Sequence, residues 1–237
     1  MRDLFTLAII PARGGSKRIP RKNIKPFAGK PIIAYSIDAA NKSECFSDII
    51  VSTEDREIAA IAVNLGGKVP FMRTQETADD HSGIADVMKE AVLAYEAWAN
   101  HEVDLVCCIL PTAPFIAADD IRKGHQMIAR DDMDAVITVV RYSYPIQRAL
   151  RVDGKHVTMI WPENYVKRSQ ELEPSYHDAG QFYWIKKDKL LEHGKVFIPK
   201  TGFICIDETS AQDIDTEDDW RYAEIKYDIL CSKKKRP

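Results

Sequence analysis

Apolar runs alternate with segments of helical periodicity along most of the chain. Short apolar runs are typical of strands that are buried on both faces of a parallel sheet. The predicted strands are residues 4–10, 48–52, 68–72, 105–110, 134–140, 181–185 and 202–206. The predicted helices are residues 31–40, 54–65 (capped by Thr53 or Glu54), a segment around 87–95, 119–129 and 217–230. This order predicts an α/β fold with a doubly wound, mainly parallel sheet and right-handed crossovers.

The rhythm changes between residues 141 and 176, where prolines interrupt the pattern. Two short alternating segments, 149–152 and 156–160, flank a predicted turn at Asp153 and Gly154. We therefore predict a hairpin-bearing insertion that projects from a single domain spanning residues 1–237. The exposed strands of such a hairpin need a partner.

Length and composition exclude several classes of protein. A chain of 237 residues suits one α/β domain with a full core, and its net charge of −3 argues against general nucleic-acid binding. No stretch reaches the ~18 apolar residues of a membrane span, so no membrane partner is expected. The five cysteines lack zinc-type spacing, and Cys107 and Cys108 suit buried strand packing. Their odd number and the absence of a signal peptide predict a cytoplasmic location.

The most informative polar segment, residues 11–23, follows the first predicted strand. Its adjacent glycines, Gly14 and Gly15, let backbone N–H groups close around an anion. The segment also carries the cations Arg13, Lys17, Arg18, Arg21 and Lys22. It lies where open α/β sheets bind ligands, although it matches neither the P-loop nor the dinucleotide motif. We predict a bound triphosphate here; the alternative is a solvated basic loop.

A second polar cluster lies near the C-terminus. In extended backbone Asp213 and Asp215 point the same way, with Ile214 packed inward. Such a pair suits Mg²⁺, which prefers carboxylate and phosphate oxygens. The alternative is helix capping by Asp215 or Thr216, followed by acids that favour the positive end of the helix dipole. We expect both, with the first two acids binding the metal.

Together, these two segments resemble the cytidylyltransferases that activate acidic sugars, such as the CMP-sialic acid synthetases. The family's opening pattern, A-R-x-x-S-K-x-x-P-x-K-N, is matched in full by residues 12–23. Further matching stretches are Ile50-Val51-Ser52-Thr53 with an acid after it, an Arg73 loop ending Asp80-His81-Ser82, Pro111-Thr112-Ala113-Pro114, and Asp213-Ile214-Asp215-Thr216-Glu217. The resemblance implies a Rossmann-like fold of the nucleotide-diphospho-sugar transferase type, with residues 141–176 as a dimerisation insertion.

Two stretches, 144–150 and 176–184, resemble the branch of this family that makes CMP-pseudaminic acid. Residues 177–180 replace the R-x-N-G of the sialic-acid branch, and Leu110 replaces its Gln. The implied reaction is CTP plus pseudaminic acid giving CMP-pseudaminic acid and diphosphate. The alternatives are the same reaction on N-acetylneuraminic, legionaminic or keto-deoxy-octulosonic acid, or a catalytically silent nucleotide-binding regulator.

The resemblance also implies roles for individual residues. The implied nucleotide-binding residues are Ala12, Arg13, Gly14, Gly15, Ser16, Lys17, Lys22, Asn23, Arg73, Asp80 and Ser82. Catalysis is assigned to Lys17, Arg13, Asp213 and Asp215, with the two aspartates holding Mg²⁺. The implied sugar-binding residues are Arg168, Ser169, Gln170, Tyr176, His177, Asp178, Gln181 and Phe182. The expected partners are CTP, an acidic sugar and a second copy of the chain, with the partner's Arg148 or the partner's Lys167 completing the sugar site.

Overall fold

The computed structural model describes residues 4–77, 83–130 and 132–234. The strands are β1 Thr6–Pro11, β2 Pro26–Phe27, β3 Lys30–Pro31, β4 Asp48–Ser52, β5 Leu105–Ile109, β6 Ala135–Arg141, β7 Leu150–Asp153, β8 His156–Met159, β9 Tyr176–Lys186 and β10 Thr201–Cys205. The α-helices are α1 Ile33–Ser43, α2 Arg56–Asn64, α3 Ile84–Ala99, α4 Ala118–Arg130, α5 Lys187–His193 and α6 Glu217–Lys234. Short 3₁₀ helices lie at Lys22–Ile24, Gln75–Thr77, Ile146–Arg148, Pro162–Asn164, Ser169–Glu171 and Glu208–Ser210.

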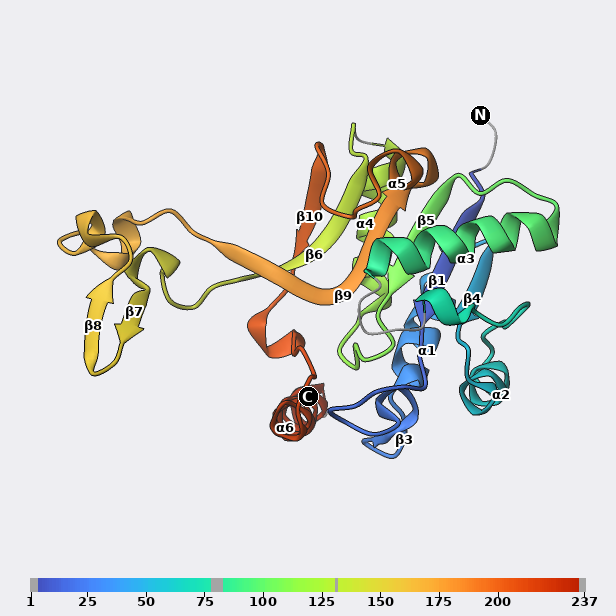
Figure 1. Ribbon diagram of the computed structural model, residues 1–237, viewed down its shortest axis with the longest axis horizontal. Helices are drawn as coiled ribbons and strands as arrows, with labels where there is room; N and C mark the ends of the chain where they lie inside the picture. Colours follow the sequence, from blue (N-terminus) through green and yellow to red (C-terminus); the bar gives the residue numbers. More distant parts are fainter. Residues whose placement is uncertain (1–3, 78–82, 131, 235–237) are drawn as a thin grey trace.

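A six-stranded sheet forms the centre of the molecule (Figure 1). Its strand order is β10-β6-β9-β5-β1-β4. The β1–β4, β1–β5 and β6–β10 pairs are parallel, whereas β9 runs antiparallel to both β5 and β6. The predicted mainly parallel sheet is therefore confirmed, with one antiparallel strand in its middle.

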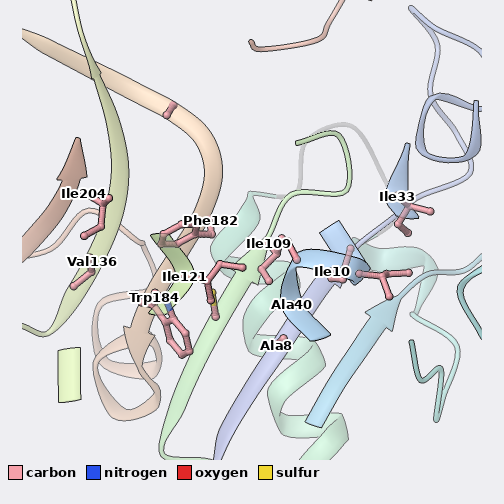
Figure 2. Packing of buried hydrophobic residues seen from close by; sticks show 14 of the residues in the cluster. Ala8, Ile10, Ile33, Ala40, Ile109, Ile121, Val136, Phe182, Trp184 and Ile204 are labelled. Carbon is pink, nitrogen blue, oxygen red and sulfur yellow. The ribbon is translucent and has the colours of Figure 1, made fainter. Parts of the chain in front are cut away.

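Helices cover both faces of this sheet, as a doubly wound fold requires. On one face, α1 and α4 contribute Ile33 and Ile121 to a cluster that also contains Ile109 of β5 (Figure 2). On the other face, α3 and α5 bring Met88 and Leu190 against the strands. Alternate residues of β5 join the two clusters because successive strand side chains point to opposite faces.

A third cluster attaches the C-terminal helix to the segment after β1. Ile214 and Trp220 pack with Phe27 of β2, and the Phe27 and Trp220 rings meet edge to face at 5.6 Å. Ile19, from the predicted triphosphate loop, belongs to the same cluster. This packing brings the late acidic segment beside the early basic loop.

Three local predictions differ from the structure. The predicted strand 68–72 is only an isolated bridge between Ile50 and Lys68, since Pro70 has no N–H to continue a ladder. The second helix is capped by Asp55 rather than by Thr53 or Glu54, because the Asp55 carboxylate accepts both open amides of the first turn. The sequence analysis also missed α5.

Residues 142–175 form an arm that extends away from the sheet, at the left of Figure 1. The predicted hairpin is confirmed as β7 and β8, with Gly154 at a positive φ of 56° in its turn. Val152 and Val157 lie directly opposite each other across the hairpin, and they are 70% and 60% exposed. The hairpin therefore presents an apolar surface that the rest of the described chain does not cover.

Two predictions from composition concern the same described residues. Among them, no helix combines the length and apolar character that crossing a bilayer requires. The five cysteines are free, and Cys107 and Cys108 are buried in β5 as predicted. Burial raises the pKa of the Cys108 thiol to about 12, so this thiol is a packing group rather than a nucleophile.

Candidate active site

Close packing against the β4–α2 junction determines the course of the basic loop after β1. The Gly14 amide donates to the Glu54 carboxylate at 2.7 Å. A Cβ on Gly14 would lie 2.5 Å from Asp55 Oδ2, whereas a Cβ on Gly15 would meet nothing within 4 Å. Gly14 is thus required by the close approach of two segments. The Gly14 N–H predicted for a phosphate is engaged by Glu54 in this arrangement.

Carboxylates of the same chain neutralise part of the loop's positive charge. Arg21 pairs with both Asp55 and Glu57, and Arg18 Nη1 lies 2.9 Å from Asp215 Oδ2. The hydrogen bond from Arg21 lowers the pKa of Asp55 to about 2, and the amides that Asp55 caps act in the same direction. A bound anion is therefore not the only source of charge balance, contrary to the argument from sequence.

The predicted proximity of the two polar clusters is confirmed. Lys22 Nζ donates to the Ile214 carbonyl oxygen at 2.6 Å and lies 3.4 Å from Asp215 Oδ1. Ile214 is 1% exposed, so it packs inward as predicted. Desolvation raises the pKa of Asp213, the neighbouring Asp215 adds to the effect, and Lys22 opposes it. Cations and acids from opposite ends of the chain share one site.

The capping interpretation of the acidic segment is also confirmed, with Thr216 as the cap. Thr216 Oγ1 accepts from the Asp219 amide at 3.2 Å, and the Asp219 carboxylate accepts from the Thr216 amide at 2.8 Å. These reciprocal bonds are a capping box. Asp219 is thus committed to α6, whereas Asp215, of the predicted metal pair, is engaged by Arg18 and Lys22 of the basic loop.

The donor set of this segment suits a hard cation that also binds substrate oxygens. Asp213 and Asp215 flank the buried Ile214 in the sequence, Asp213 exposed and Asp215 partly exposed. Within residues 4–77, 83–130 and 132–234, no group of three or more His, Cys, Asp or Glu side chains could hold a metal ion. An ion held by two carboxylates would need further ligands from phosphate and water, which is typical of Mg²⁺.

The nucleotide residues predicted from the motif meet at a cleft of about 240 Å³. Its lining residues include Arg13, Lys22, Asn23, Arg73 and Thr112. Asn23 Nδ2 donates to the Arg13 carbonyl oxygen at 2.8 Å, which holds the two sides of the loop together. Arg73 is buried, and its Nε has no hydrogen-bond partner in the described part of the chain.

Five other predicted nucleotide residues lie apart from the cleft lining or outside the described residues. Ala12 is fully buried and its amide donates to Ser52 O, so it shapes the loop rather than offering a surface. Ser16 and Lys17 lie on the loop, with Lys17 exposed. The predictions for Asp80 and Ser82 lie outside the described residues.

A second cavity, of about 320 Å³, adjoins Asp213. Two of the predicted sugar residues, His177 and Asp178, line it. The Asp178 carboxylate accepts from the Gly180 amide at 2.9 Å and from the Tyr183 hydroxyl at 2.6 Å, which fixes the entry of β9. Lys226 of α6 also lines this cavity, and the sequence analysis missed it.

Three other predicted sugar residues on β9 are placed differently. The prediction for Phe182 is wrong, because its side chain is fully buried in the core beside Trp184. Gln181 is 3% exposed and donates to Ser210 O at 2.7 Å, so it connects β9 to the following loop. Tyr176 is exposed at the start of β9, with its ring 6.0 Å from that of Phe203 on β10.

The remaining predicted sugar residues belong to the arm. Arg168, Ser169 and Gln170 are exposed on and beside a 3₁₀ helix at Ser169–Glu171. The arm extends away from the sheet and from α6 in Figure 1, so one chain does not bring these residues to Asp213. Arg148, on the same arm, donates to Lys167 O. The residues predicted to bind the sugar are thus divided between β9 and the arm.

Comparison with known proteins adds independent information. Residues 7–188 match the family model described as Cytidylyltransferase. A pseudaminic acid cytidylyltransferase of Campylobacter jejuni is 37% identical over 224 residues, or 94% of this chain and 96% of that protein. A CMP-N,N'-diacetyllegionaminic acid synthase of Legionella pneumophila is 32% identical, over 92% of this chain and 94% of that protein. A solved CMP:2-keto-3-deoxy-manno-octonic acid synthetase complexed with CTP has a TM-score of 0.68 at 17% identity, over 97% of this chain and 99% of that one, so the two share a fold.

Proposed function

The chain belongs to the cytidylyltransferase family, and from that premise we propose that it joins CMP from CTP to pseudaminic acid, releasing diphosphate. The choice of acceptor is supported by the 37% identity to a pseudaminic acid cytidylyltransferase over nearly the whole of both chains. The observation that carries the proposed chemistry is the convergence of Arg18 and Lys22 with Asp215. These contacts place a basic loop that suits phosphates beside a pair of acids that suits Mg²⁺, the counter-ion of those phosphates.

The proposed nucleotide site lies along the loop and the adjoining cleft. Arg13, Ser16 and Lys17 bind the triphosphate, and Lys17 offsets the charge that grows on the departing diphosphate. Lys22 and Asn23 position this loop through their contacts with Ile214 and Arg13. Asp213 and Asp215 hold Mg²⁺, which supplies charge neutralisation at the phosphate oxygens.

The proposed sugar site is the cavity beside Asp213. Lys226 is the cation among its lining residues, and its ammonium donates to the carbonyl oxygens of Ala211 and Glu208 at 2.8 and 3.3 Å. An ammonium group has three donors, so one remains for the sugar carboxylate. His177 supplies a ring nitrogen for hydroxyl or amide groups of the sugar.

The reaction follows from positioning rather than from a covalent intermediate. The anomeric hydroxyl attacks the α-phosphorus in line, forming the new O–P bond and losing its proton while the bond to diphosphate breaks. The cleft containing Arg13 and the cavity containing His177 adjoin opposite parts of the same loop-and-acid site. This arrangement suits a nucleotide and a sugar that meet near Asp213.

The proposed enzyme is a homodimer joined through the arm. An isolated two-stranded hairpin is marginally stable in water, and the hairpin of this arm has an exposed apolar pair at Val152 and Val157. A second copy would cover this pair. It would also explain how Arg168, which is remote from Asp213 in its own chain, could reach a sugar site across the interface.

A screen of diphosphate release tests the proposed function. CTP is paired in turn with pseudaminic, legionaminic, N-acetylneuraminic and keto-deoxy-octulosonic acids, and each acid is also tested with ATP, GTP and UTP. We expect the largest kcat/KM with CTP and pseudaminic acid. Faster turnover of another acid would show that the proposed acceptor is wrong but that the reaction is still cytidylyl transfer. Binding of CTP with no diphosphate release from any acid would instead identify a catalytically silent regulator.

A further inference from the structure

The acid that follows Thr53 is part of the matched motif, but neither the metal nor the sugar site uses it. Glu54 lies between β4 and α2, with a side chain that is 13% exposed. Its Oε1 accepts from the Gly14 amide at 2.7 Å, and its Oε2 accepts from Arg73 Nη2 at 2.9 Å. One buried carboxylate therefore connects the basic loop after β1 with the segment after β4 and α2.

The two groups that Glu54 holds both belong to the proposed nucleotide site. The Gly14 amide lies in the triphosphate loop, and Arg73 lines the same cleft as Arg13 and Asn23. The Arg73 side chain is 3% exposed, so it is placed by its partners rather than by solvent. A buried guanidinium without a carboxylate beside it would be costly, so the pair with Glu54 stabilises Arg73 in this position.

One donor of Arg73 has no partner among the described residues. Arg73 Nε is buried and has no hydrogen-bond partner in the described part of the chain. Buried donors are almost always satisfied, and an orphan in a cleft indicates an acceptor that arrives with the substrate. Phosphate and ribose oxygens of a nucleotide are acceptors of this kind.

We propose that Glu54 is a positioning residue for nucleotide binding: its carboxylate holds Arg73 and the Gly14 amide so that Arg73 can donate to CTP. This inference rests on the proposed function, because CTP is the nucleotide to which Arg73 would donate. It goes further by assigning a role to a residue that makes no contact with substrate. It also explains why Gly14 approaches the β4–α2 junction so closely.

The test measures CTP binding by titration calorimetry without any sugar, alongside kcat and both KM values. Glu54→Gln keeps the shape of the side chain but removes its charge and one of its two acceptor oxygens, so it cannot hold both the Gly14 amide and Arg73. We expect CTP affinity to fall roughly 10-fold or more, as for loss of a charged hydrogen bond, with the KM for sugar within about twofold of wild type. Glu192→Gln, which changes an exposed acid of α5 that pairs with Lys189 and lines neither cavity, should leave CTP affinity unchanged.

A double-variant cycle separates positioning from a general loss of structure. Arg73→Ala should weaken CTP binding as much as Glu54→Gln, and the double variant should be no weaker than Arg73→Ala alone. Glu54→Asp keeps the charge on a shorter side chain, so it should bind CTP more tightly than Glu54→Gln. It also provides a second variant if Glu54→Gln folds poorly. Wild-type affinity in a folded Glu54→Gln protein, or additive losses in the cycle, would overturn the inference. If wild-type protein does not bind CTP at all, the proposed function fails instead.

Discussion

The basic loop beside α6 and the projecting arm are built in opposite ways. At the loop, Lys22 bonds to a carbonyl 192 residues away, and Ile214 is buried beneath it. In the arm, the four residues of β7 are all exposed, and Val152 faces Val157 without any cover from the described chain. Contacts between residues far apart in the sequence stabilise the basic loop, whereas local backbone pairing stabilises the arm.

The difference shows which half of the proposed reaction one chain can prepare alone. The nucleotide half is set by contacts within the chain, because Glu54, Asp55 and Asp215 hold the loop before any ligand is present. The sugar half is divided, since His177 lies on the sheet side and Arg168 on the arm. We therefore expect nucleotide binding to survive changes that separate two copies, and sugar transfer to depend on them.

The largest expected effect comes from the acid pair at the first region. Asp213→Asn should lower the rate of diphosphate release by at least about 10²-fold, because charge stabilisation at the phosphates is lost. CTP binding should stay measurable. Asp218→Asn, which removes an exposed acid on α6, is the control and should retain activity. Activity of Asp213→Asn close to wild type would refute the metal assignment.

The next effect concerns the arm. Val157→Asp places a charge where we expect a second copy to pack, so the dimer should dissociate about 10–100 times more readily, as for loss of one buried valine. Sedimentation velocity measures the change, and sugar turnover should fall while CTP binding does not. Val63→Asp on α2, at a position that is 56% exposed, is the matched control. An unchanged dimer would show that the arm is not the interface.

A smaller effect, on the free energy of unfolding, concerns the ion pair between Arg21 of the basic loop and Asp55. The pKa of Asp55 is lowered to about 2 from 3.8, mainly by Arg21, with Glu57 nearby also paired to that arginine. A lowered pKa in the folded state stabilises the fold above pH 3.8, and this contribution is lost as pH falls through about 2. Asp55→Asn should therefore cost about 1–2 kcal/mol of unfolding free energy at pH 7.

Urea unfolding of wild type and Asp55→Asn at several pH values checks this expectation. The difference between the two proteins should shrink as the pH is lowered from 5 toward 3. Asp38→Asn, which removes an exposed surface pair with Lys42, should show no such dependence. A difference that stays constant over this range would contradict the lowered pKa of Asp55.

The smallest expected effect is the loss of stability when alanine replaces a glycine that has a positive φ and open space around it. Two such glycines can be compared. Gly29, between β2 and β3, has φ 92°, and Gly154, in the arm turn, has φ 56°. Alanine at either position costs about 1 kcal/mol. Gly29→Ala should lower the global melting temperature, whereas Gly154→Ala should only speed amide exchange in β7 and β8. Equal global destabilisation would show that the arm unfolds together with the sheet.

Much of the fold follows from the sequence because buried parallel strands are continuous apolar runs. The segments at β1, β4, β5 and β6 carry that signal and were predicted within a few residues. The segment 68–72 carries a similar signal, but Pro70 prevents a ladder. Position in the sheet has no comparable local signal, so the antiparallel placement of β9 between β5 and β6 could not be predicted.

Site residues that belong to a sequence motif could be predicted. Site residues whose position depends on the packing of distant segments could not. Residues of the opening motif, such as Arg13 and Asn23, do line the cleft. Phe182 was misplaced because it lies in the later part of β9, where residues on both faces of the strand are buried. Lys226 stands on a mostly polar helix, where nothing in the sequence distinguishes it from other lysines. Only the fold brings it beside Asp213.

The most direct test of the central claim is a crystal structure with CTP and Mn²⁺, in which anomalous scattering locates the metal. The two clusters are expected to bind one nucleotide together. We predict a manganese peak in contact with Asp213 or Asp215 and with a phosphate oxygen of a CTP whose triphosphate lies along residues 13–17. A triphosphate bound away from that loop, or a metal bound away from both aspartates, would contradict the account.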